Sequence, residues 1–108
     1  MKIKDFKDKL GLRVLTDYDQ EKEITGCYCG DLLSWVMSRG KEGDAWLTVM
    51  GNVNAVAVAV LTECACIVLT ENASLDEQAK IKAEMQGVCF LQSDKNAYEL
   101  AVEISKII

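Results

Sequence analysis

The chain has 108 residues, of which half are apolar and 27% are charged, and its net charge is −5. This length and balance are typical of one soluble globular domain. The acidic charge leaves no basic stripe to neutralise phosphates, which argues against a nucleic-acid partner and against an anionic membrane surface. The chain contains no histidine, which excludes Ser-His and Cys-His nucleophile pairs and zinc sites with imidazole ligands.

The N-terminal stretch, MKIKDFKDKLG, is charged throughout and lacks the apolar run of a signal peptide. The longest apolar run, residues 55–61, is far shorter than the ~18 residues that a membrane span needs. We therefore expect a cytoplasmic protein with no membrane partner. In that compartment the five cysteines are expected to stay reduced.

Short β-rich runs alternate with helical stretches along the chain. In chain order, the pattern predicts a helix with Ile3, Phe6 and Leu10 on one face, strands over 12–16 and 24–29, a helix over 31–39, a strand over 45–50, a helix over 53–63, a strand over 65–69, a helix over 74–86, a strand over 88–91 and a helix over 96–107. Repeated strand–helix units imply parallel strands joined by right-handed crossovers. The predicted fold is therefore a three-layer α/β/α domain with a mostly parallel sheet.

Four of these helices begin at residue types that suit an N-cap, namely Asp31, Asn52, Ser74 and Asn96. A glutamate follows three residues after Ser74 and again after Asn96, which predicts two capping boxes. Gly40 and Gly87 are expected to end the helices that precede them.

Residues 53–63 are ambiguous, because their valines favour a strand and their alanines a helix. Eleven residues are long for a strand, and Asn52 is a good N-cap. We therefore predict a buried helix.

Ligands of parallel α/β sheets bind at the loops that follow the strands. Four polar loops of this kind can be identified, at residues 30–31, 51–54, 70–74 and 93–96. Each precedes a helix N-terminus, whose free N–H groups favour an anion. However, Asp31, Glu71 and Asp94 would repel a phosphate. Two interpretations stay open: the polar residues cap their own helices, or the loops bind a small ligand or a partner.

Other site motifs are missing or incomplete. There is no GxxxxGK[ST] phosphate loop and no GxGxxG. The charged stretch DYDQEKE, residues 17–23, lacks the Asp-x-Asp-x-Asp-Gly order of a calcium loop, so we expect it to be solvated. An enzyme that uses Asp31, Glu71 and Asp94 is a further hypothesis, and it would need a pocket with a strongly shifted carboxylate.

Two C-x-C pairs, Cys27 with Cys29 and Cys64 with Cys66, could supply four thiolates to a zinc or iron–sulfur site. The usual structural-zinc spacing is C-x2-C, which neither pair has. Free cysteine also packs as a small apolar residue. We therefore predict that the four thiols and Cys89 fill the core, with a metal or redox site as the alternative.

Residues 24–104 resemble the DRTGG domain family. The matching segments are ITGCYCGDLLS, AWLTVMGNVNAVAVAVL, CIVLTENASLDEQ and GVCFLQSDKNAYELAVEI, in the order and spacing of the family. The Asp-Arg pair of the family falls on Asn52 and Val53. Its Thr-Gly-Gly falls on residues 70–72, where only Thr70 is kept.

The resemblance implies one α/β domain over residues 1–108, similar to the N-terminal domain of HPr kinase/phosphorylase. Residues 1–23 supply its first helix and strand, and 24–108 are the best-matching region. It also implies a non-catalytic regulatory or interaction module, since kinase chemistry belongs to a separate domain. Short stand-alone members of this kind are typical of anaerobic bacteria.

The resemblance and the loop pattern together give the expected site and partners. The ligand- or partner-binding residues are expected to be Asp31, Asn52, Asn54, Thr70, Glu71, Asn72, Asp94 and Tyr98. The expected partner is a second copy of the chain or another regulatory protein, with no cofactor. The alternative function is a cysteine-based metal-binding or redox protein.

Overall fold

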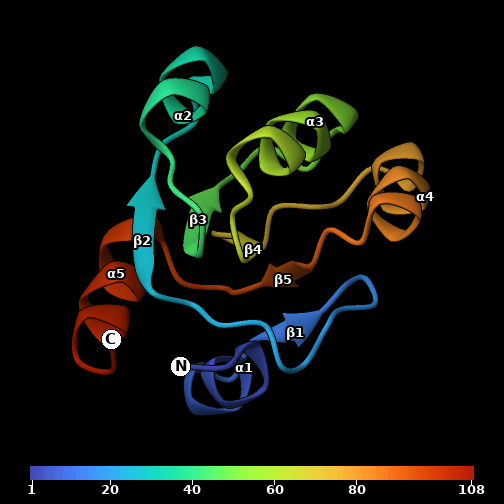
Figure 1. Cartoon of the computed structure of the whole chain (residues 1–108). Helices are drawn as coiled ribbons and strands as arrows, with labels where there is room; N and C mark the ends of the chain where they lie inside the picture. The colour runs from blue at the N-terminus through green and yellow to red at the C-terminus, as the bar shows by residue number, and fades with distance from the viewer.

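One sheet of five strands forms the middle layer of the fold (Figure 1). The computed structural model describes the whole chain, Met1–Ile108. The strands are β1 (Arg13–Val14), β2 (Gly26–Cys29), β3 (Asp44–Thr48), β4 (Cys66–Leu69) and β5 (Phe90–Gln92). The helices are α1 (Ile3–Leu10), α2 (Leu33–Arg39), α3 (Val53–Thr62), α4 (Glu77–Gln86) and α5 (Ala97–Ser105).

The strand order is β1-β5-β4-β3-β2. Strands β2 to β5 pair in parallel, and only β1 is antiparallel to its neighbour, β5. Helices α2, α3 and α4 cover one face of the sheet, and α1 and α5 cover the other (Figure 1). The predicted three-layer α/β/α fold with a mostly parallel sheet is confirmed.

The central strands β3 and β4 are buried along their whole length. Successive side chains of a strand point to opposite faces of the sheet. Ala45 and Leu47 accordingly pack in the core beneath α1 and α5, whereas Trp46 packs beneath α2, α3 and α4. The Trp46 indole Nε1 donates a hydrogen bond of 2.8 Å to the carbonyl oxygen of Gly30, which satisfies its polar group.

The ambiguous segment is a helix, as predicted. The Oδ1 of Asn52 accepts a hydrogen bond of 3.0 Å from the backbone N–H of Ala55. This N-cap favours a helix over a strand for the segment that becomes α3. The helix carries no charged side chain and ends at Glu63, whose φ of 56° is left-handed. None of the five helices is long and apolar enough to cross a membrane.

Two of the predicted caps are wrong. Helix α2 begins at Leu33 instead of residue 31, and Asp31 caps no helix, because its carboxylate is bonded to the end of β3. Helix α4 begins at Glu77, so the predicted capping box of Ser74 does not form. The capping box of Asn96 with Glu99 is present, as is the left-handed end of α4 at Gly87.

The loops that follow β3 and β4 are in direct contact at Gly51. A side-chain carbon at this position would lie on the carbonyl oxygen of Ser74, and the backbone N–H of Asp76 donates to the Gly51 oxygen at 2.8 Å. Glycine is therefore required here for close approach of two backbones, although its φ is unexceptional.

We expect Gly51→Ala to lower the free energy of unfolding by about 2–3 kcal/mol, because neither backbone can move away from the added carbon. Urea denaturation followed by far-UV circular dichroism measures this. Gly11→Ala is the control, since a carbon at Gly11 meets no atom within 4 Å and carries only the cost of a φ of 63°, about 1 kcal/mol. Equal losses in the two variants would contradict the contact.

Candidate functional site

The loops at the carboxyl ends of the strands are joined to one another by their own backbones. The N–H of Glu71 donates to the Lys95 oxygen and the N–H of Asn72 to the Ser93 oxygen, both at 2.8 Å. Glu71 and Asn72 have left-handed φ values of 55° and 57°, which turn the chain back toward the loop that follows β5. The loops after β4 and β5, two of the four predicted loops, are thus joined by backbone hydrogen bonds.

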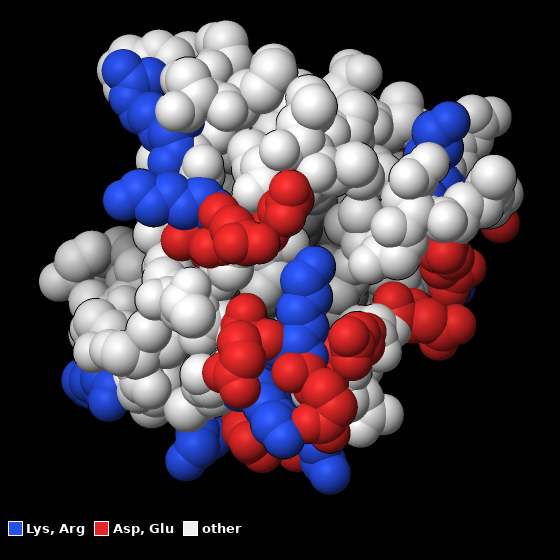
Figure 2. Space-filling view, in the orientation of Figure 1, with Lys and Arg blue, Asp and Glu red and all other residues white.

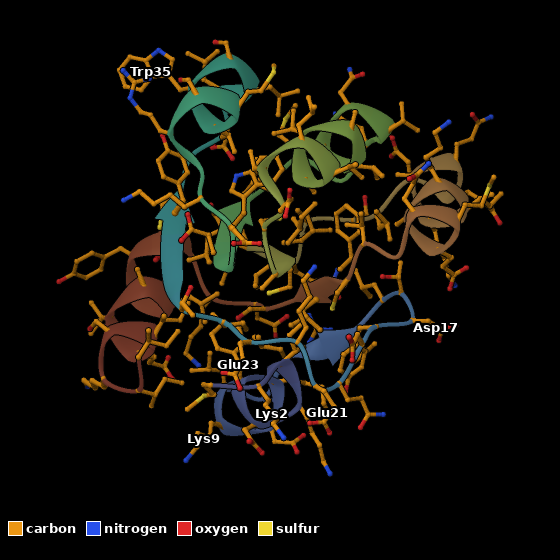
Figure 3. All side chains as sticks on the ribbon, viewed as in Figure 1. Lys2, Lys9, Asp17, Glu21, Glu23 and Trp35 are labelled. Carbon is orange, nitrogen blue, oxygen red and sulfur yellow. The ribbon has the colours of Figure 1, made fainter.

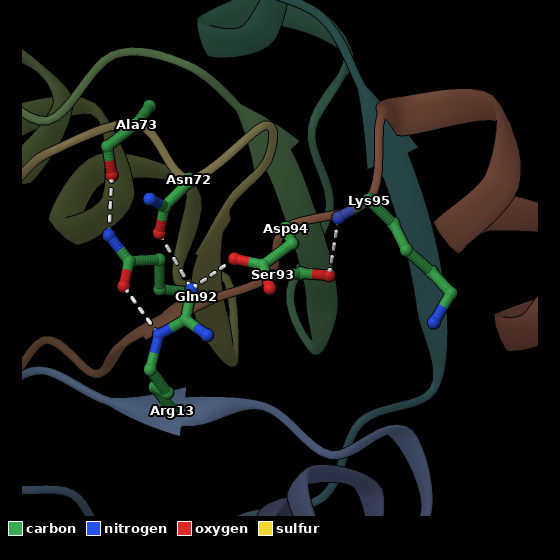
Figure 4. A network of polar contacts seen from close by, with 7 residues as sticks. All are labelled: Arg13, Asn72, Ala73, Gln92, Ser93, Asp94 and Lys95. Atoms are coloured by element: carbon green, nitrogen blue, oxygen red, sulfur yellow. Dashed lines mark hydrogen bonds and ion pairs between the residues drawn. The ribbon is translucent and has the colours of Figure 1, made fainter.

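Arg13 also joins side chains of these two loops and of β5 by hydrogen bonds (Figure 4). Its Nη2 donates to Asn72 Oδ1 at 2.7 Å and to Asp94 Oδ1 at 2.8 Å, and its Nε donates to Gln92 Oε1 at 2.8 Å. The Nε2 of Gln92 in turn donates to the Ala73 oxygen at 2.9 Å. Two predicted site residues, Asn72 and Asp94, are therefore brought together by an arginine on β1 that the sequence analysis did not select.

Asp31 belongs to a different part of the same edge. Its Oδ1 accepts hydrogen bonds from Thr48 Oγ1 at 2.7 Å and from the backbone N–H of Val49 at 3.0 Å. This ties the loop after β2 to the end of β3. The Asp31 carboxylate thus already accepts two hydrogen bonds from β3 and the residue that follows it.

The remaining predicted site residues do not converge. Asn52 caps α3 through Ala55, and Asn54 is exposed in the first turn of that helix. Thr70 is buried at the end of β4. Tyr98 is 79% exposed on α5, on the other helical layer.

The cavities of the structure lie elsewhere. None of the four is lined by any of the eight predicted site residues. One, of about 500 Å³, lies at the opposite edge of the sheet, where the strands begin. Lys22 lies in this cavity with Glu23, Glu42 and Glu63, and its Nζ donates to the Cys64 oxygen at 3.3 Å. Figure 2 shows basic and acidic side chains side by side around the centre of the view.

Two further cavities lie along α3 and α4. One, of about 520 Å³, is lined by Val53, Gln78, Ile81 and Lys82. The other, of about 240 Å³, is lined by Val56, Ala57, Val60, Leu61, Lys82 and Gln86. The two share Lys82 and are lined by both helices, and together they are hereafter called the α3–α4 groove. Sequence analysis missed it, although the absence of charge from residues 53–62 was a signal.

The four cysteines of the two C-x-C pairs do not meet. Cys64 and Cys66 lie in the two separate cores on either side of the sheet, whereas Cys27 and Cys29 are exposed on the edge strand β2. No group of three or more His, Cys, Asp or Glu side chains is placed to hold a metal ion. The four-thiolate site is therefore excluded, and the core-packing prediction is correct for Cys64, Cys66 and Cys89 but wrong for the first pair.

The buried and the exposed cysteines differ in the pKa of their thiols. Burial raises the pKa of Cys64 to about 11 and that of Cys89 to about 12, so both stay protonated near neutrality. On β2, the thiol of Cys27 donates a hydrogen bond to the sulfur of Cys29. This bond lowers the pKa of Cys29 to about 7 and raises that of Cys27. Cys29 is thus the most nucleophilic of the five thiols.

Because the thiolate is the reactive form, alkylation of Cys29 by iodoacetamide is expected to rise with pH with a midpoint near pH 7 and to fall away below it. Cys27→Ala removes the hydrogen bond and is expected to move the midpoint upward, toward the ordinary thiol value of 9.0. Mass spectrometry of peptides measures the modification of each cysteine. The buried cysteines are the internal control and react only after denaturation; an unchanged midpoint in Cys27→Ala would contradict the shared proton.

No family model matches the sequence, and no curated protein matches it. The fold, however, is known. It is similar to the crystal structure of the CBS and DRTGG domains of the regulatory region of a Clostridium perfringens pyrophosphatase in complex with an activator, diadenosine tetraphosphate. The TM-score is 0.71 at 7% sequence identity, over 94% of this chain and 44% of that one. The likeness shows the fold alone, and the chain spans less than half of that structure.

Proposed function

We propose that this chain is a non-catalytic regulatory module that acts by associating with a second copy of itself. The observation that carries the proposal is a large exposed apolar surface on the layer formed by α2, α3 and α4. The similarity to a regulatory region that contains CBS and DRTGG domains supports the regulatory class.

Three neighbouring helices and their ends contribute large exposed apolar side chains. These are Leu32, Trp35, Met37, Val53, Val60, Leu61, Ile81 and Met85, hereafter the apolar face. Their exposed fractions run from 41% for Val53 to 74% for Met85. Large apolar side chains exposed together on one layer are typical of a protein–protein interaction site.

The distribution of charge favours a second copy as the occupant. Two chains with a net charge of −5 repel one another through most of their surfaces. Helix α3, at the centre of the apolar face, carries no charge at all. Figure 2 shows the region over α3 as mostly uncharged, with basic side chains beside α2, whereas charged side chains of both signs crowd the region around α1. Figure 3 likewise places Trp35 at the far end of the molecule from Lys2, Glu21 and Glu23.

The α3–α4 groove gives the apolar face a shape into which a helix can pack. Val53, Val60 and Leu61 lie along the groove, and the small Ala57 between them allows a second helix to approach closely. In a two-fold symmetric dimer, α3 of each copy can pack into the groove of the other, so one surface supplies both sides of the interface.

The edge of the sheet where the parallel strands end, hereafter the carboxyl edge, is poorly suited to a phosphate-bearing ligand like the activator of the similar structure. Arg13 is the cation best placed there, and its Nε and Nη2 already donate to Gln92, Asn72 and Asp94, which leaves only Nη1 for a ligand. A phosphate at Nη1 would lie close to the Asp94 carboxylate, which repels it. We therefore place the function on the helical layer.

A charge in the middle of the apolar face is expected to weaken the dimer. Val60→Glu should raise the dissociation constant about tenfold or more, because association would bury an unpaired carboxylate. Sedimentation velocity over a range of protein concentrations measures this constant. Val102→Glu is the matched control, since Val102 is a helical valine of similar exposure, 38% against 44%, on α5.

A wild-type protein that stays monomeric at all concentrations would contradict the proposal. An equal rise of the dissociation constant in the two variants would also contradict the proposal. The weaker association would then come from an interface elsewhere or from the added charge in general.

A further inference from the structure

The edge strand β2 presents two thiols that the proposed association does not use. Cys27 and Cys29 lie opposite Ala45 and Leu47 of β3 in the parallel register, and all four side chains point to the face of the sheet covered by α1 and α5. Both cysteines are nevertheless exposed, because β2 is the last strand of the sheet and no further strand pairs with its outer side (Figure 1).

The extended backbone keeps the two thiols adjacent but disfavours a disulfide between them. Residues i and i+2 of a strand are about 6.6 Å apart at their Cα atoms, near the upper limit of about 6.8 Å for a disulfide. Both side chains lie on the same face of β2, so the two sulfur atoms are neighbours. An ion between two sulfurs, with bonds of about 2.3 Å, needs a sulfur separation of roughly 4.6 Å, which small side-chain rotations can supply.

The surroundings select the kind of ion. No third Cys, His, Asp or Glu is placed to coordinate with the pair, so a tetrahedral zinc site is not available. Thiolates bind Cu⁺, Zn²⁺ and iron–sulfur clusters, and two thiolates without further ligands suit Cu⁺, the soft ion among these that accepts low coordination.

We propose that Cys27 and Cys29 bind one Cu⁺ ion per chain between their two sulfur atoms. Binding breaks the S–H bond of each thiol that is still protonated, forms two Cu–S bonds and releases those protons to solvent, while the copper stays monovalent.

Anaerobic titration of the whole chain with Cu⁺, in competition with the chromophoric chelator bicinchoninate, tests the site. The expected result is one ion per chain, with Cys27 and Cys29 protected from iodoacetamide in peptide mass spectra. Cys27→Ser and Cys29→Ser should each weaken binding at least about 100-fold, as expected when one of two metal–sulfur bonds is lost. Both substitutions are on the surface, and circular dichroism checks that each variant is folded.

Cys89→Ala is the matched control, because it removes a buried thiol and leaves the exposed pair intact; it should bind Cu⁺ as the wild type does. Several results would overturn the proposal. These are single serine variants within about threefold of wild type, protection of the buried cysteines instead of the exposed pair, or one ion per two chains.

Discussion

The need to cover a parallel sheet on both faces governs this structure. Strands β3 and β4 are apolar and buried on both sides, so helices must lie above and below them. On one side this role falls to α3, which is apolar around its whole circumference. A helix of that composition covers the sheet with one face and leaves the other apolar face exposed. The surface proposed for association is therefore a consequence of how the core is built.

The same sheet explains why the carboxyl edge offers little to a ligand. Parallel strands end together, and their loops must satisfy many backbone and side-chain polar groups in a small space. Here the loops satisfy one another: Glu71 and Asn72 bond to the loop after β5, and Arg13 joins Asn72 to Asp94. What remains available for function lies on the outer helical surface and on the exposed edge strand.

The fold class was predictable because it depends on period and order, which the sequence carries directly. Strand and helix positions agree to within a few residues, and Asn52 was enough to assign α3. The site was less predictable, because its contacts join distant segments. Arg13 lies 81 positions from Asp94, and its role depends on β1 pairing antiparallel at the sheet edge. The exposure of Cys27 and Cys29 likewise depends on β2 being the last strand, which local pattern does not reveal.

The most direct test of this account is the concentration dependence of the backbone amide resonances in 1H–15N NMR spectra. The account predicts that resonances of α3 (Val53–Thr62) and α4 (Glu77–Gln86) shift or broaden as the protein concentration rises. Those of Asn72 and Asp94 should stay constant. Shifts confined to the carboxyl-edge loops, or none at any concentration, would contradict the claim that the helical layer is the functional surface.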